Sequence, residues 1–231
     1  MNVAIVVAAG KGTRLGGVRP KQFLELGGVP IIIHTLRQFE RSQQIDEIIV
    51  VLPPEETANF LAFAQDFGLK KVSRAVAGGA TRAQSVLCGL ASIRDAEIVA
   101  VHDGVRPLVT PDEIDATMHA ARANGAAILT ASAADTIKEI KDDRVMRTLP
   151  RANLRRALTP QCFRYDILKR AYDQLNDLEA SGFEITDDSM LVERLGVEIV
   201  TVAGRARNIK ITSAEDLILA EAILKSVASG Q

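Results

Sequence analysis

Val3-Ala4-Ile5-Val6-Val7 leads directly into Ala8-Ala9-Gly10-Lys11-Gly12-Thr13-Arg14-Leu15-Gly16-Gly17, and this stretch decides the fold class. The first five residues are apolar and mostly β-branched, a composition that favours a buried strand. Four glycines follow, and they allow the backbone unusual dihedral angles and a close approach to a ligand. In α/β sheets, ligands bind in the loops beyond the carboxyl ends of the strands. The stretch therefore predicts the first strand and the first ligand-binding loop of such a sheet.

Apolar runs of the same kind recur along the chain and alternate with helix signals. Further strands are predicted at Ile48 to Leu52, Lys71 to Val76, Ile98 to Val101, Ala126 to Thr130 and Val197 to Val202. Continuous apolar runs of this length suit strands that are covered on both faces. Capping boxes that start helices are expected at Thr110-Pro111-Asp112-Glu113 and Thr212-Ser213-Ala214-Glu215. The alternation predicts one doubly wound, mostly parallel α/β sheet in a single domain spanning residues 1–231.

One segment, Asp135 to Leu149, departs from this alternation. Its apolar residues alternate loosely and Asp142-Asp143 stands in the middle, a pattern that predicts a β-hairpin. A hairpin alone is rarely stable in water, so burial against a second subunit would explain it. We therefore expect an inserted β-arm over approximately residues 132–156 and a homodimer formed through this arm.

The overall composition argues against several functional classes. The 231 residues carry a formal net charge of −1, and 4% are aromatic with no Trp, which disfavours nucleic-acid and membrane partners. Cys88 and Cys162 lie far apart, so neither a disulfide framework nor a zinc site is indicated. The apolar run at residues 2–10 is short and lacks a basic leader, so it predicts neither a signal peptide nor a membrane span. A cytoplasmic protein is expected.

The loop after the first strand carries an uncompensated positive charge. Lys11, Arg14, Arg19 and Lys21 lie in a stretch of 24 residues that contains no Asp or Glu. Together with backbone N–H groups exposed by the glycines, these cations predict a polyphosphate site. The alternative is a glycine turn with solvated cations. The spacing of a P-loop does not occur, and Leu15 stands where a dinucleotide fingerprint needs its third glycine.

Four later segments carry further candidate groups. The loop Gly78 to Ser85 could let backbone groups read a base, or Thr81 or Ser85 could simply cap a helix. Asp103 ends a predicted strand, where a metal or a substrate hydroxyl would be met, whereas His102 is expected to be a hydrogen-bonded structural residue. Thr186-Asp187-Asp188 indicates a helix start with Thr186 as the cap. The cations Arg151, Arg155, Arg156 and Arg164 flank Thr159-Pro160-Gln161, and some of them are expected simply to be solvated.

Taken together, these segments resemble the methylerythritol 4-phosphate cytidylyltransferase family. The first block, Ala8-Ala9-Gly10-x-Gly12-x-Arg14 with Pro20-Lys21-Gln22-Phe23, is shared with many nucleotidyltransferases. The other blocks are Gly78-Gly79-x₂-Arg82-x₂-Ser85-Val86, Val101-His102-Asp103-x₂-Arg106-Pro107, Asp135-Thr136-x-Lys138, Thr159-Pro160-Gln161, Thr186-Asp187-Asp188 and Asn208-Ile209-Lys210-x-Thr212. Seven blocks in this order run nearly end to end and are highly specific. The resemblance implies a Rossmann-like nucleotidyltransferase fold.

The resemblance also implies a role for each matching residue. Arg14 and Lys21 would stabilise charge on the α-phosphate of CTP, and Arg151 and Lys210 would orient the attacking phosphate. The nucleotide would be held by Ala8, Ala9, Gly10, Gly12, Gly79, Arg82 and Ser85. The acceptor would be surrounded by Asp103, Arg106, Thr136, Thr159, Thr186 and Lys210, with Thr136 and Arg151 supplied by the partner's arm.

The reaction implied is attack of the acceptor phosphate on the α-phosphorus of CTP, with pyrophosphate leaving. Mg²⁺ is expected as the cofactor, held mainly by the triphosphate and water, with Asp103 as an optional protein ligand. Two alternatives remain open at this point: a cytidylyltransferase for another polyol phosphate such as ribitol 5-phosphate, and a non-catalytic nucleotide-binding regulator. Pyrophosphate release separates an enzyme from a regulator.

Overall fold

A central sheet of seven strands organises the chain, and the computed structural model describes residues 1–10 and 20–228. The order across the sheet is β11-β7-β10-β6-β1-β4-β5. The strands are β1 (Val3–Val7), β4 (Glu47–Leu52), β5 (Val72–Ala77), β6 (Ile98–Asp103), β7 (Ala126–Ser132), β10 (Arg155–Arg164) and β11 (Val200–Ala203). All neighbouring strands run parallel except at β10, which is antiparallel to both β6 and β7. The prediction of a mostly parallel α/β sheet is confirmed.

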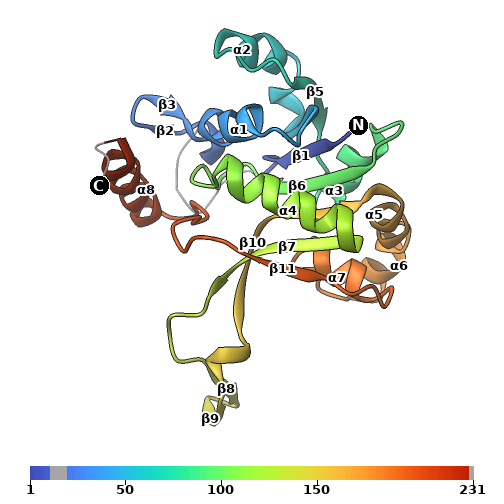
Figure 1. Cartoon of the computed structure of the whole chain (residues 1–231), viewed down its shortest axis with the longest axis vertical. Helices are drawn as coiled ribbons and strands as arrows, with labels where there is room; N and C mark the ends of the chain where they lie inside the picture. Colours follow the sequence, from blue (N-terminus) through green and yellow to red (C-terminus); the bar gives the residue numbers. More distant parts are fainter. Residues whose placement is uncertain (11–19, 229–231) are drawn as a thin grey trace.

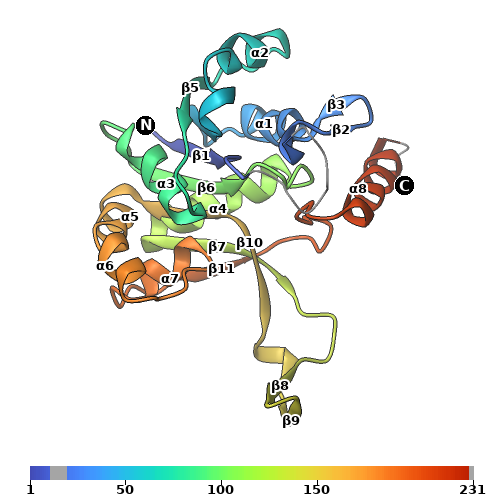
Figure 2. The same ribbon diagram turned by 180° about the vertical axis from the view of Figure 1, so that it is seen from behind.

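Helices cover both faces of this sheet (Figures 1 and 2). One face packs against α1 (Ile31–Arg41), α2 (Phe60–Asp66) and α4 (Pro111–Asn124). The other packs against α3 (Arg82–Ala91), α5 (Tyr165–Tyr172), α6 (Leu175–Ala180) and α7 (Asp188–Glu193). The last helix, α8 (Ala214–Ala228), lies beside the short hairpin of β2 (Glu25–Leu26) and β3 (Val29–Pro30). None of these helices is both long enough and apolar enough to cross a membrane, within the residues that the structure describes.

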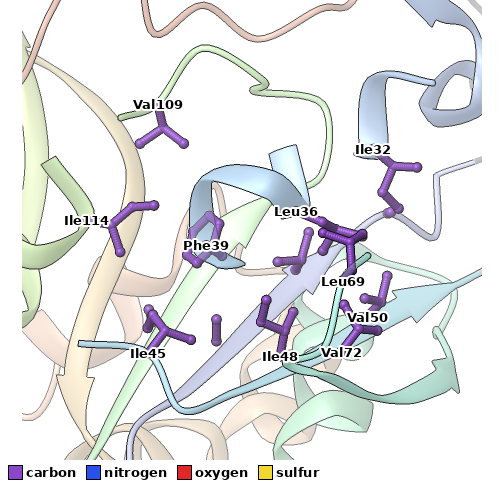
Figure 3. Close-up of a cluster of buried hydrophobic side chains, with 14 of the residues drawn as sticks. Ile32, Leu36, Phe39, Ile45, Ile48, Val50, Leu69, Val72, Val109 and Ile114 are labelled. Carbon is purple, nitrogen blue, oxygen red and sulfur yellow. The ribbon is translucent and has the colours of Figure 1, made fainter. Parts of the chain in front are cut away.

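Alternate residues of each central strand enter opposite layers of the core. Ile48 and Val50 pack with Leu36 and other side chains on one face, where Figure 3 shows them, whereas Ile49 and Val51 pack on the other. All four of these β4 side chains are fully buried. This double coverage explains why the strands appear in the sequence as continuous apolar runs, without the polar alternation of a half-exposed strand.

Strand β10 was not predicted from the sequence, and several strand ends differ from the predicted ones by one to three residues. Residues Arg155–Arg164 include the expected solvated cations, but their second half, from Leu158 to Phe163, is buried between β6 and β7. The register shifts between Ala157 and Gln161, which accommodates Pro160 within a paired strand. Strand β6 continues to Asp103, and β11 begins at Val200, later than predicted.

One of the three predicted helix starts has the expected cap, and the other two caps lie one residue later. Thr110 and Glu113 form the predicted capping box of α4. Before α8, Ser213 Oγ accepts from the Asp216 N–H, and the Asp216 carboxylate accepts from the Ser213 N–H, so the expected pair of Thr212 and Glu215 is wrong by one position. At α7 the cap is Asp187, not Thr186. In both cases the neighbouring residue also has a side-chain oxygen, so the sequence left the choice open.

The hairpin expected at Asp135 to Leu149 is present as an arm that projects from the sheet (Figure 1). It consists of β8 (Lys138–Lys141) and β9 (Arg144–Thr148), which leads to the 3₁₀ turn Arg151–Asn153. Asp142 and Asp143 have φ of 48° and 59°, which suits a two-residue turn with positive φ at both positions. Four large apolar side chains of the arm are exposed: Ile137, Ile140, Val145 and Met146.

Truncation of a core side chain should destabilise this fold. Leu36 is fully buried on α1, so Leu36→Ala should lower the free energy of unfolding by about 2–5 kcal/mol. Leu219→Ala is the matched control, because Leu219 is 49% exposed on α8, and it should cost less than about 1 kcal/mol. Urea unfolding followed by circular dichroism, at one protein concentration, measures both changes. Equal losses in the two variants would contradict the assignment of the core.

Candidate functional site

A cavity of about 270 Å³ lies at the carboxyl ends of β1, β5 and β6. Backbone bonds hold the loops there in continuation of the sheet, because Ala8 N donates to Val51 O, Gly78 N to Leu52 O and Gly104 N to Val7 O. The lining residues are Val7, Ala8, Ala9, Gly10, Lys21, Gln22, Gly79, Ala80, Thr81, Arg82, Ser85, Asp103, Val105, Lys210 and Thr212. Segments that are far apart in the sequence therefore form one site. It lies at the carboxyl ends of the strands, where α/β proteins bind ligands.

The close approach of two of these loops requires a glycine at position 78. A Cβ atom at Gly78 would lie 2.3 Å from the Ala9 Cβ and 2.8 Å from the Ser85 Oγ. No side chain fits at such distances without moving the backbone. The loop after β1 and the loop after β5 can therefore form adjacent walls of the cavity only because residue 78 has no side chain.

Lys21 and Gln22 enter the cavity from the short 3₁₀ helix Lys21–Phe23. Gln22 is almost fully buried, and its Nε2 donates a hydrogen bond of 2.6 Å to Ala8 O. This bond fixes the segment that carries Lys21 against the first wall of the cavity. Sequence reasoning gave a role to Lys21 but none to Gln22, although both stand in the same motif.

The carboxylate of Asp103 is the electrostatic centre of the site. Its oxygens lie 3.0 Å from Arg82 Nε, 3.1 Å from Arg106 Nε and 3.1 Å from Lys210 Nζ. Burial alone would raise the pKa of Asp103, but the charges of Arg82, Lys210 and Arg106 hold it well below its usual range. Because the folded-state pKa is depressed, this carboxylate stabilises the fold above its unfolded pKa, and the contribution is lost as pH falls through the folded value.

Arg82, at the start of α3, connects this centre to α7 in the same helical layer. Its Nη2 lies 2.8 Å from the Asp188 carboxylate, which is fully buried and also accepts a 2.5 Å hydrogen bond from the Tyr172 hydroxyl. Burial opposes the charge of Arg82, but Asp188 and Asp103 outweigh it and raise its pKa above the usual range. Arg82 therefore remains a fixed cation between two carboxylates.

His102 is a structural residue, as predicted. It is fully buried, and burial lowers its pKa to about 3. Its Nε2 lies 3.2 Å from Arg106 O, which can only accept, so Nε2 donates and Nδ1 accepts the 2.9 Å bond from the Thr159 hydroxyl. Thr159 Oγ1 in turn accepts from Asp103 N at 3.2 Å. This neutral chain of hydrogen bonds fixes the backbone beside the Asp103 carboxylate.

A second cavity, of about 230 Å³, adjoins the first. Arg82, Asp103 and Lys210 line both cavities. The second is completed by Arg106, Ala157, Leu158, Thr159, Gln161, Thr186 and Asp187. Gln161 Nε2 donates to Asp187 Oδ2 at 2.9 Å, and Gln161 Oε1 accepts from the backbone N–H groups of Asp188 and Ser189. Strand β10, which was not predicted, thus supplies part of this wall.

The structure brings most of the predicted site residues together. Ala8, Ala9, Gly10, Lys21, Gly79, Arg82, Ser85, Asp103 and Lys210 line the first cavity, and Arg106, Thr159 and Thr186 line the second. Thr136 and Arg151 are exposed on the arm and line neither of these two cavities of the described chain. The predicted residues Gly12 and Arg14 lie outside the described residues.

The described residues do not form a metal site of their own. No group of three His, Cys, Asp or Glu side chains within residues 1–10 and 20–228 could hold a metal ion. Both Asp103 oxygens already lie against cations, which argues against Asp103 as a metal ligand. A cation-rich pair of cavities with few free carboxylates suits phosphate groups better than a bare metal ion.

Comparisons with known proteins agree with this geometry. The family model described as "IspD: 2-C-methyl-D-erythritol 4-phosphate cytidylyltransferase" matches residues 2–226. Proteins named 2-C-methyl-D-erythritol 4-phosphate cytidylyltransferase are 43% identical in Pelotomaculum thermopropionicum, covering 96% of this chain and 94% of that one, and 44% identical in Geotalea uraniireducens, covering 98% and 97%. The crystal structure of 4-diphosphocytidyl-2C-methyl-D-erythritol synthase from Anaerococcus prevotii superposes with a TM-score of 0.85 at 34% identity, covering 97% and 96%. The chain therefore belongs to the 2-C-methyl-D-erythritol 4-phosphate cytidylyltransferase family.

Proposed function

We propose that this chain transfers the cytidylyl group of CTP to 2-C-methyl-D-erythritol 4-phosphate and releases pyrophosphate. Full-length membership of the family supports this reaction. The observation that carries it is the pair of adjoining cavities that share Arg82, Asp103 and Lys210. A nucleotide in the first cavity and an acceptor phosphate in the second would meet at these three side chains.

The chemistry asks the chain for positioning and charge stabilisation. The acceptor phosphate is already ionised near pH 7, so its oxygen attacks the α-phosphorus as the bond to the leaving pyrophosphate breaks, and no strong general base is needed. His102, the histidine beside the site, is buried with both ring nitrogens hydrogen-bonded, so it is not placed to act as a base. Lys210 would orient the acceptor phosphate, and Lys21, with Arg14, would stabilise charge that develops on the α-phosphate.

Mg²⁺ is proposed as the cofactor. The described residues offer no cluster of metal ligands, so the ion would be held mainly by triphosphate oxygens and water, an arrangement that Mg²⁺ favours. When bound, it would neutralise phosphate charge.

We further propose that the protein acts as a homodimer in the cytoplasm. The exposed apolar side chains Ile140, Val145 and Met146 on the arm are suited to burial against a second subunit. Thr136 and Arg151 stand on the same arm, away from the two cavities of their own chain, and would reach the partner's acceptor. Cys88 and Cys162 are free thiols, which fits a reducing compartment.

The reaction is tested first by pyrophosphate release. CTP, UTP, ATP and GTP are each combined with methylerythritol 4-phosphate or ribitol 5-phosphate in the presence of Mg²⁺. We expect release only with CTP and methylerythritol phosphate, and we expect it to stop with EDTA and to return with excess Mg²⁺. Pyrophosphate release with ribitol phosphate instead would identify ribitol phosphate as the acceptor. CTP binding without any pyrophosphate release would indicate a non-catalytic regulator.

The roles proposed for Lys21 and Arg14 at the α-phosphate are tested by removing each side chain. Lys21→Ala and Arg14→Ala should each lower the single-turnover rate by roughly 10²–10³, the usual effect of removing one preorganised donor to a transition state. Lys70→Ala is the control, because this exposed lysine precedes the amino end of β5, whereas the cavity lies at the carboxyl ends of the strands. Near wild-type rates in both site variants would rule out these roles.

The arm is tested by mixing two impaired variants. Arg151→Ala should impair acceptor use more than CTP binding, because Arg151 is proposed to orient the acceptor phosphate. In a heterodimer with a Lys21→Ala subunit, one of the two sites is complete if the arm acts on the partner, so about half of the wild-type rate should return. Absence of rescue in purified heterodimers would show that the arm does not act across the dimer.

A further inference from the structure

The wall of the nucleotide cavity between Gly79 and Thr81 is held by side chains of α3. Ser85 Oγ accepts from Gly79 N at 3.2 Å, and Gln84 Oε1 accepts from Ala80 N at 3.0 Å. Thr81 caps the helix by accepting from Gln84 N at 3.0 Å. Two consecutive backbone N–H groups of this exposed loop are thus satisfied by side chains of the helix that follows it.

A carboxylate from a different helix completes this arrangement. Glu179, on α6, accepts a 2.6 Å hydrogen bond from Gln84 Nε2 and a 2.9 Å hydrogen bond from Thr81 Oγ1. It stands 95 and 98 residues away from these two partners in the sequence. Glu179 is half-buried, and hydrogen bonds to an ionised acceptor are stronger than those between neutral groups. No sequence pattern indicated a role for Glu179.

The orientation of the Gln84 amide depends on this carboxylate. Because Glu179 can only accept, it holds the Gln84 amide nitrogen toward itself, and the amide oxygen then faces the Ala80 N–H. Without Glu179, the Gln84 amide would be held in this orientation by the Ala80 N–H alone, and the side chain would be freer to turn or to move away. Such a movement would leave the Ala80 N–H without its acceptor and would loosen the loop.

We propose that Glu179 is a positioning residue for nucleotide binding, which acts through Gln84 and Thr81 to hold the loop Gly79–Thr81 in its CTP-binding shape. This inference rests on the proposed function of the cavity. Glu179 is not among the residues that line the first cavity, so its effect is indirect. Its removal should weaken CTP binding and leave the acceptor side, at Thr159 and Thr186, unchanged.

The test compares variants of the full-length protein. Glu179→Ala should raise KM and Kd for CTP by about tenfold, a change that corresponds to about 1.4 kcal/mol. The KM for methylerythritol phosphate should be unchanged. Glu179→Gln should recover part of the affinity, because its amide oxygen can still accept from Gln84. Asp177→Ala is the matched control: its carboxylate is exposed on the same helix and makes no hydrogen bond or ion pair within the described chain.

A second variant covers the case in which Glu179→Ala does not fold. Gln84→Ala removes the acceptor of Ala80 N and should raise the CTP Kd to a similar extent, and adding Glu179→Gln to it should change little more. An unchanged Kd for CTP in Glu179→Ala, or in Gln84→Ala where only that variant folds, would overturn the inference. So would an equal rise in both KM values or a loss of melting temperature alone. A wild-type protein that releases no pyrophosphate would instead defeat the proposed function.

Discussion

The arrangement of the site depends on the ion pairs that Asp103 makes at the end of β6. Arg82 arrives from the start of α3, Arg106 from the turn after β6, and Lys210 from the segment before α8, and all three lie within 3.1 Å of its oxygens. Its side chain is 8% exposed, so water screens these charges only weakly. Without the carboxylate, three cations would face one another in a partly buried position. Asp103 thus balances part of the positive charge of this site, in a chain whose formal net charge is −1.

This concentration of charge also determines where the two substrates would meet. The three side chains Arg82, Asp103 and Lys210 border both cavities, so phosphate groups entering from either side would approach the same cations. Each of these cations is already fixed by an ion pair and loses little conformational freedom when a ligand binds. A reaction that needs two anions brought together is served by such preorganised charge more than by a base.

The sheet and its two helical layers form a frame, and the loops around the cavities and the arm are attached to it. The sheet and its two helical layers set the positions of Asp103, Gly78 and the wall around Gly79. Further interactions fix the groups around the cavities. Gln22 donates a hydrogen bond to Ala8, Asp188 forms an ion pair with Arg82, and Glu179 accepts a hydrogen bond from Gln84. The arm that carries Thr136 and Arg151 projects from this frame (Figures 1 and 2), so the roles proposed for these two residues require a second subunit.

Local patterns in the sequence predicted the α/β class, five of the strands to within about two residues, and the hairpin, because apolar runs and turn residues act through neighbours in the chain. The resemblance to the family, not a local pattern, indicated many of the residues around the cavities. Only the tertiary structure decided the rest. Strand β10 pairs with β6 on one side and with β7 on the other, although Pro160 argues against a strand. Arg82 forms ion pairs with Asp103 and Asp188, which are 21 and 106 residues away in the sequence. Glu179 accepts hydrogen bonds from Gln84 and Thr81, which are 95 and 98 residues away. No local pattern in the sequence indicates such pairings, because these segments meet only in the folded chain.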